Sequence, residues 1–174
     1  MIGLYSVRRA PALLPLLLSA AAVGAPVPAT SNATGTASLL RPLTILKQSD
    51  LDFGALAVTG AGTAVIDPVS GVLSTTGLVT PVGPAAAAHA AVFTTTGSRT
   101  SNVHIRVPQN PITLIRVGGT QTMSVSTWTL DGPQNRKFPA NAAFNFAVGA
   151  TLTVAAGQAD GTYLGTFDVT VQYP

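Results

Sequence analysis

Apolar and polar residues alternate along much of this chain, and alternation with a period of two residues predicts β-strands. The longest example lies at the end of the sequence. From Tyr163 to Tyr173 the odd positions hold Tyr, Gly, Phe, Val, Val and Tyr, whereas Leu164 is the only apolar residue at an even position. We therefore predict one long strand with a single apolar face. Because the sequence stops at Pro174, we expect no later segment to pair with the free edge of that strand.

Shorter segments of the same kind precede this strand, separated by turn signals rich in glycine, proline and aspartate. Their spacing is typical of a β-sandwich, in which short strands and turns follow one another closely. The predicted strands are residues 43–47, 51–57, 63–66, 72–76, 78–82, 90–96, 103–107, 112–117, 121–130, 142–148 and 150–155. The pattern therefore predicts a single all-β domain.

The amino-terminal segment has the layout of a secretory signal peptide. Arg8 and Arg9 precede an apolar stretch over residues 12–23, and small residues and prolines follow. The stretch is shorter than the roughly 20 residues that a membrane-spanning helix needs. We predict cleavage after Ala29, with cleavage after Ala22 as the alternative. Residues 1–29 are thus expected to direct export by the Sec route and to leave no transmembrane anchor.

The composition limits the functions open to the mature chain. Without Arg8 and Arg9, seven of the nine basic residues remain, against six acidic residues, all of them aspartate. The basic residues are scattered and form no cluster with aromatic residues, so we predict no nucleic-acid binding. The chain has no cysteine, which excludes disulfides, thiolate chemistry and a cysteine-based metal site.

Few residues suit catalysis or metal binding. His104 is predicted to face solvent from its strand, and His89 lies in an alanine-rich stretch. Asp50 and Asp52 are expected to cap the turn at Gly54 rather than to form a catalytic pair. No nucleophile elbow or metal-binding triad is present in the sequence. We therefore predict a protein that is not an enzyme and holds no metal or cofactor.

The single tryptophan is open to two interpretations. Strict alternation places Trp128 on the opposite face of its strand from Met123 and Val125. It is either an exposed platform for a sugar or a neighbouring subunit, or a covered aromatic side chain in the contact with a second sheet.

Four segments resemble the bacterial family called domain of unknown function 4402 (DUF4402). They are residues 41–54, 91–97, 122–125 and 149–173, and the resemblance covers roughly residues 35–174. The family is similar in pattern to spore-coat-U-like and archaic chaperone–usher pilins, which also begin with a Leu-Asp-Phe-Gly-like strand. Those pilins also end with Gly-Thr-Tyr and a later Val-Thr-Val-x-Tyr. They usually carry a cysteine near the first strand, and this chain has none.

The resemblance implies an immunoglobulin-like β-sandwich that lacks its last strand. In such pilins a periplasmic chaperone fills the resulting groove until the amino-terminal extension of the next subunit replaces it at an outer-membrane usher. An open edge beside an apolar groove promotes aggregation unless a strand fills it. The implied acceptor and chaperone edge is the final strand, with Tyr163, Phe167, Val169, Val171 and Tyr173. Tyr173 is either the chaperone-contacting end of this strand or an aromatic cap on a sandwich edge.

Residues 30–41 form the predicted extension and residues 42–174 the domain. In the extension, Ala33, Gly35, Ala37 and Leu39 alternate with polar residues, so one apolar row is available to enter a groove. Three interpretations follow: donation to a copy of the chain or a related subunit, completion of its own sandwich, or a disordered terminus.

The function expected from these features is that of a secreted, fimbrial, pilin-like subunit that polymerises by strand donation. It would pass through the periplasm to the cell surface and serve cell adhesion as part of a fimbrium. The alternative is a secreted monomeric β-sandwich that binds a carbohydrate or another surface ligand.

Overall fold

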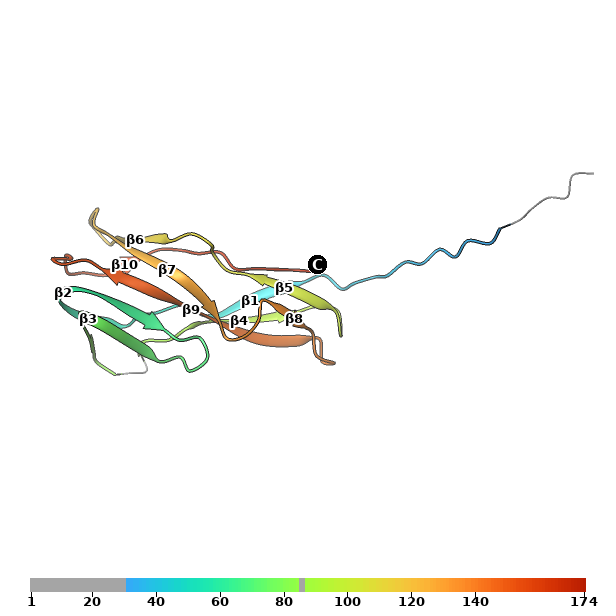
Figure 1. Cartoon of the computed structure of the whole chain (residues 1–174), viewed down its shortest axis with the longest axis horizontal. Helices are drawn as coiled ribbons and strands as arrows, with labels where there is room; N and C mark the ends of the chain where they lie inside the picture. The colour runs from blue at the N-terminus through green and yellow to red at the C-terminus, as the bar shows by residue number, and fades with distance from the viewer. Residues whose placement is uncertain (1–30, 85–86) are drawn as a thin grey trace, which may run out of the picture. The chain divides into compact units, whose positions relative to one another are not determined.

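The computed structural model describes residues 31–84 and 87–174 (Figure 1). The chain divides into a first unit, residues 1–37, and a second unit, residues 38–174. The predicted signal peptide, residues 1–29, lies outside the described residues. Residues 31–43 form neither helix nor strand. Across the described part of the chain, no helix has the length and apolar character that a membrane crossing requires.

The second unit is built from β-strands, because its valine-, threonine- and alanine-rich segments favour a pleated, half-buried surface. The strands are β1 (Thr44–Ser49), β2 (Ala55–Ile66), β3 (Leu73–Val82), β4 (Ala91–Thr96), β5 (Asn102–Arg106), β6 (Ile112–Arg116), β7 (Thr122–Leu130), β8 (Asn135–Lys137), β9 (Ala143–Val154), β10 (Tyr163–Leu164) and β11 (Thr170–Gln172). The all-β prediction is therefore confirmed.

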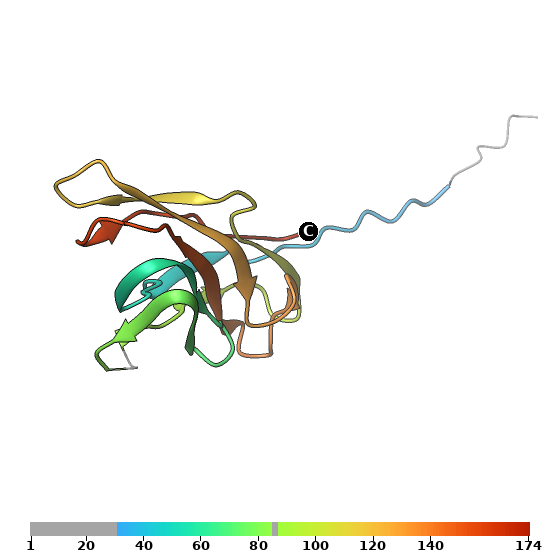
Figure 2. The ribbon, with the colours of Figure 1, turned by 60° about the vertical axis from the view of Figure 1, so that its left-hand side comes forward.

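The strands form two antiparallel sheets. The larger sheet has eight strands in the order β1-β4-β9-β7-β6-β10, and β2 and β3 branch from β9. It curls into a half-barrel, as Figure 2 shows. The smaller sheet has three strands in the order β11-β5-β8. The final segment of the chain therefore contributes β10 to the larger sheet and β11 to the smaller one.

The long strand β9 organises the core of the second unit. It pairs with β4 through residues 143–148, with β2 through residues 151–154 and with β7 along its other edge. Phe146 and Val148, two of its inward residues, are almost fully buried. Phe146 stacks on Phe93 of β4 with ring centroids 5.4 Å apart. Two clusters of buried apolar side chains lie along this strand and form the core.

Three predicted breaks between strands are wrong. Residues 73–76 and 78–82 belong to the single strand β3, residues 143–148 and 150–154 belong to the single strand β9, and residues 55–57 and 63–66 belong to the single strand β2. In β3, Gly77 has a φ of 72° and lies so close to β2 that an added Cβ would come 2.4 Å from the Ala61 carbonyl oxygen. β2 has an irregular register between Val58 and Gly62 at this place. The glycine thus lets the two strands stay paired across the irregularity, and it does not end the strand.

Two further boundaries differ from the prediction. The first part of the predicted strand at 51–57 is only an isolated bridge between Asp52 and His89, and residues 55–57 form the start of β2. The short strand β8 was not predicted, because its residues Asn135, Arg136 and Lys137 show no apolar alternation. It forms through pairing with β5, which is a tertiary effect that local sequence does not encode.

The close approach of β3 to β2 at Gly77 predicts that a side chain at this position lowers the free energy of unfolding. Gly77→Ala introduces both an unfavourable positive φ and a backbone overlap, whereas Gly71→Ala introduces only the positive φ, because nothing lies within 4 Å of Gly71. We expect Gly71→Ala to lower the free energy of unfolding by about 1 kcal/mol. We expect Gly77→Ala to lower it by about 1–3 kcal/mol more. Denaturant unfolding of both variants measures the difference, and equal losses would contradict the close approach.

Candidate functional site

Within the described residues the branched larger sheet ends at three strands, β1, β10 and β3, and β3 pairs only with β2. β1 pairs only with β4, and β10 pairs only with β6. β11 is also an edge strand, since it pairs only with β5. Within residues 31–84 and 87–174, each of these strands therefore has one edge with no β-partner. We call β1, the final segment (residues 163–173) and the interior between them the open seam.

The final segment lines one side of the open seam with an apolar row. The side chains at the odd positions Tyr163, Phe167, Val169, Val171 and Tyr173 are half-buried, whereas those at the even positions are exposed. Three members of the row, at positions 167, 169 and 171, pack against the core cluster that contains Phe146. The row thus faces the core but is incompletely covered. Its role as an acceptor edge stays a prediction.

The prediction of one continuous strand over residues 163–173 is wrong. β10 pairs with β6 and β11 pairs with β5, and residues 165–169 between them form no ladder. The pairings of β10 with β6 and of β11 with β5 place residues 165–169 opposite residues 107–114. In that stretch Pro108 and Pro111 have no N–H group to donate. The segment nevertheless lies close to β6 at Gly165. A Cβ added there would come 2.7 Å from a Leu114 methyl group, so glycine allows this close approach.

β1 lines the other side of the open seam. Its residue Ile45 pairs with Thr95, and Lys47 pairs with Phe93. Directly paired residues point to the same face of a sheet. Since Thr95 and Phe93 are buried, Ile45 and Lys47 face the interior, yet 41% of the surface of Ile45 is exposed. An inward aliphatic side chain with this exposure indicates that a covering element is missing beside β1.

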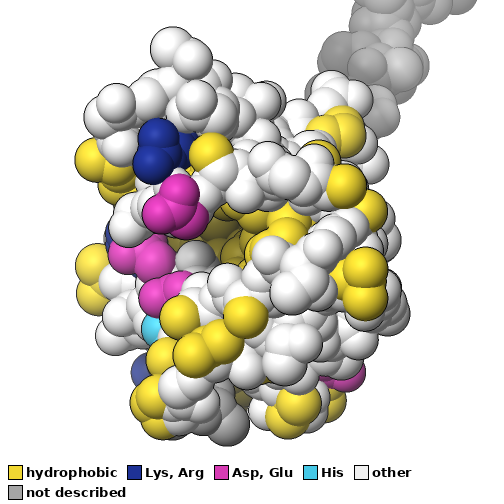
Figure 3. Space-filling view, turned by 90° about the vertical axis from the view of Figure 1, so that its left-hand side faces the viewer, with side chains coloured by type: hydrophobic (Ala, Val, Ile, Leu, Met, Phe, Trp, Pro, Cys, Tyr) yellow, Lys and Arg dark blue, Asp and Glu magenta, His cyan; other side chains and the backbone are white. Residues whose placement is uncertain are grey.

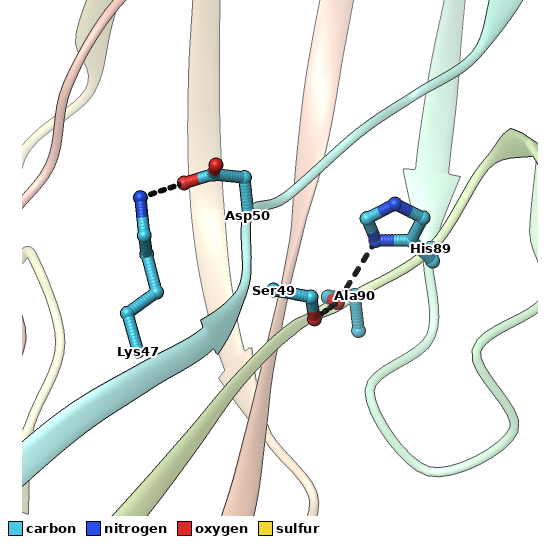
Figure 4. A network of polar contacts seen from close by, with 5 residues as sticks. All are labelled: Lys47, Ser49, Asp50, His89 and Ala90. Carbon is cyan, nitrogen blue, oxygen red and sulfur yellow. Dashed lines mark hydrogen bonds and ion pairs between the residues drawn. The ribbon is translucent and has the colours of Figure 1, made fainter.

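The interior is open at the end of the second unit that lies on the left of Figure 1, away from the C-terminus. Figure 3 shows this end hollowed, with hydrophobic side chains on the floor of the hollow and charged side chains along one side of its rim. One charged contact beside β1 is an ion pair in which Lys47 Nζ lies 2.5 Å from Asp50 Oδ1 (Figure 4). A hollow with an apolar floor is typical of surfaces that bind another chain.

The two sides of the open seam are joined near the C-terminus. The Tyr173 hydroxyl donates a hydrogen bond to the Arg41 carbonyl oxygen at 2.8 Å and accepts one from the Ser98 N–H at 2.7 Å. The Arg41 N–H donates to Ser98 Oγ at 2.5 Å. We call these three hydrogen bonds the Tyr173 latch. Sequence reasoning missed it, because no local pattern relates residues that are 132 positions apart.

The predicted donor residues lie in the part of the chain without strands. Ala33, Gly35 and Ala37 belong to the first unit. Leu39 lies at the start of the second unit, where 91% of its surface is exposed. Because none of these residues is in a strand, their backbone N–H and C=O groups are not engaged in a ladder and can pair with a strand.

The two neighbouring aspartates make separate contacts. Asp52 Oδ1 accepts a hydrogen bond from the Gly54 N–H at 2.7 Å, which confirms the predicted turn cap. Asp50 does not cap this turn and instead forms the ion pair with Lys47. The prediction that Asp50 caps this turn is therefore wrong, because the positively charged Lys47 ammonium group attracts the Asp50 carboxylate.

Each of the two histidine rings lies near one polar group among the described residues. His104 Nδ1 lies 2.7 Å from Asn135 Oδ1, and His89 Nδ1 lies 3.3 Å from the Ala90 carbonyl oxygen. Figure 4 shows that Ser49 Oγ donates to the same carbonyl. The described residues contain no group of three histidine or aspartate side chains that could hold a metal ion.

Trp128 occupies a different face from the one that strict alternation predicts. The register of β7 shifts between Ser126 and Thr129, and Thr127 has a φ of 51°. This β-bulge turns Trp128 inward, where it packs against both core clusters and lies 4.5 Å from the ring of Phe167. Trp128 is therefore a half-buried aromatic side chain that packs on the core, and its inward orientation depends on the bulge, which has no local sequence signal.

Comparison with known proteins identifies a family for most of the chain. Residues 43–173 match the model of the family described as "Domain of unknown function (DUF4402)". No curated protein and no solved structure matches the chain. The predicted family is therefore confirmed, whereas the resemblance to pilins is a prediction that these comparisons do not support.

The contact between Phe167 and Trp128 makes a prediction for the apolar row. Phe167→Asp places a carboxylate among the side chains of the core, so we expect a loss of about 3 kcal/mol in the free energy of unfolding. Asp168→Ala is the matched control, because Asp168 is exposed, and we expect a change within about 0.5 kcal/mol. Thermal unfolding followed by Trp128 emission measures both. Equal melting of the two variants would show that the row does not face the core.

The Tyr173 latch makes a second prediction. Tyr173→Phe removes the acceptor of the Ser98 N–H, and an unpaired amide costs about 1–3 kcal/mol. We therefore expect hydrogen exchange at the Ser98 amide to accelerate by at least about fivefold. Ser98→Ala removes only the bond from the Arg41 N–H and leaves the Tyr173 bonds in place. If exchange at residue 98 is the same in Tyr173→Phe as in the unmodified protein, the latch does not form in solution.

Proposed function

The chain belongs to the DUF4402 family, whose description names no function, and we propose that it is a structural subunit that polymerises by strand donation on the bacterial surface. The observation that carries the proposal is the open seam. It has a free edge on each side and two inward-facing rows of side chains that are incompletely covered. In this proposal the two sheets are an immunoglobulin-like sandwich, and the missing element is one strand between β1 and the final segment.

The donor in this proposal is the extension of a second copy or of a related subunit. Residues 31–40, when extended, span about 33 Å at roughly 3.3 Å per residue. The final segment, residues 163–173, has eleven residues, so one extension matches one seam in length. Ala33, Gly35, Ala37 and Leu39 would point inward, while the polar residues between them would face solvent.

The Tyr173 latch favours donation between molecules over completion of the same molecule. To enter its own seam beside β1, the extension would have to reverse direction at residues 41–43. The backbone of Arg41 is held there by Tyr173 and Ser98, and Pro42 has no N–H group to support a tight turn. A strand that arrives from another molecule meets no such constraint.

Strand donation of this kind builds a fibre. The donor and the acceptor are different surfaces of the same chain, so each subunit offers a new acceptor and the contact does not close into a dimer. Until it is filled, the open seam is an aggregation hazard. The proposal therefore includes a periplasmic chaperone that covers the seam, an usher at the outer membrane, and a signal peptide that brings the chain to the periplasm.

Substitutions in the extension test the proposal of strand donation. Leu39→Asp places a charge where the donor enters the apolar seam, and we expect polymers of the processed protein to be lost. Ser38→Asp adds the same charge on the solvent-facing side, and we expect polymers to form as in the unmodified protein. Size-exclusion chromatography and electron microscopy measure the length distribution.

Addition of a peptide with the sequence of residues 31–41 completes the test. We expect it to bind the Leu39→Asp protein and to raise its melting temperature, because the peptide supplies the strand that the variant cannot donate. If both variants form the same polymers, or if the unmodified protein is monomeric and the peptide does not bind it, the proposal is wrong.

A further inference from the structure

A cavity of about 310 Å³ lies on the second unit where β7 bulges beside the loop between β5 and β6. Its volume is at the lower end of the range of about 300–1,000 Å³ for small-ligand pockets. The side chains that matter for recognition are Gln109, Asn110, Ser126, Thr127, Trp128 and Gln134. None of these belongs to the apolar rows of the open seam, although the Trp128 ring contacts Phe167 of the final segment.

The lining of the cavity is polar and uncharged. Three carboxamides and two hydroxyls can each both donate and accept hydrogen bonds. Proline and valine side chains of the loop add apolar surface, and the lining contains no aspartate, glutamate, lysine, arginine or histidine. A lining of this kind does not favour ions. It fits a neutral ligand that has many hydroxyl groups and some apolar C–H surface.

Trp128 lines the cavity with part of its ring. Its Nε1 is buried and has no hydrogen-bond partner among the described residues, so this N–H group is not offered to a ligand in the cavity. Trp128 therefore contributes apolar ring surface to the cavity.

The backbone beside Trp128 is strained. Thr127 adopts a φ of 51°, a conformation that is costly for a β-branched residue and that glycine would adopt freely. Strain of this kind gathers at binding sites, where the surrounding structure maintains it. Here it accompanies the bulge that turns Trp128 inward and leaves Ser126 and Thr127 at the wall of the cavity.

We propose that this cavity binds one neutral saccharide unit. The carboxamides of Gln109, Asn110 and Gln134 contact its hydroxyl groups, while Trp128 and the loop prolines cover its apolar C–H face. This inference does not rest on strand donation, since a subunit of a fibre and a monomer would carry the same cavity. It assigns the protein a ligand-binding role in addition to its proposed structural one.

Trp128 is the only tryptophan of the chain, so its fluorescence reports on the cavity directly. The full processed protein is titrated with the methyl glycosides of glucose, galactose, mannose and N-acetylglucosamine, up to tens of millimolar, so that sites with dissociation constants of about 1 mM are filled. We expect a saturable change in emission with at least one glycoside. We expect Asn110→Ala and Gln134→Ala to weaken that binding by at least about tenfold.

Two controls separate the possible outcomes. Gln121→Ala removes a carboxamide outside the cavity, and we expect it to bind as the unmodified protein does. The Leu39→Asp variant is also expected to bind, which distinguishes failure of this inference from failure of the proposed function. The inference is overturned if no glycoside changes the emission, or if the two cavity variants respond as strongly as the unmodified protein. A response to a capped peptide such as Ala-Thr-Gly-Thr, but to no glycoside, would overturn the saccharide assignment as well.

Discussion

The structure depends on one constraint: backbone N–H and C=O groups that lie at a strand edge need partners, and β1 and the final segment each have one edge without a β-partner within the described residues. The side chains show the same deficiency. The row from Tyr163 to Tyr173 faces the core but stays half-buried, and Ile45 on the opposite side is inward yet 41% exposed. In the proposed function, a single additional strand pairs with the free edges and covers the two rows. The proposed function follows from this geometry.

Much of the fold could be predicted from the alternation of apolar and polar residues, because that alternation directly determines which side chains face the core. It identified the all-β class, most strand positions and the inward row of the final segment. It failed where long-range contacts decide the structure. Gly77 continues a strand because it meets an irregular stretch of β2, and the final segment splits in two because Pro108 and Pro111 interrupt its partner. Trp128 faces inward because of a β-bulge that has no local signal.

The same distinction applies to the candidate sites. Alternation identified the residues that line the final segment, whereas the role of the extension as a donor stays a prediction. The Tyr173 latch and the cavity beside Trp128 depend on residues far apart in the sequence, and only the folded chain brings them together. The two sites also meet at one contact. Trp128 lines the cavity, and its ring lies 4.5 Å from that of Phe167 in the row of the open seam. The core beneath both sites is therefore shared.

The most direct test of strand donation is a disulfide between two molecules, which the absence of native cysteine makes easy to interpret. One protein carries a single cysteine in the extension, placed in turn at Ala33, Ala37 or Leu39, and a second protein carries only Val169→Cys. Strand donation predicts that mixing and mild oxidation yield a heterodimer for at least one of these pairs, while cysteines at the outward positions 34, 36 and 38 yield none. If no pair forms a heterodimer, and a single chain with both cysteines forms only an internal disulfide, the extension fills its own seam and the account is contradicted.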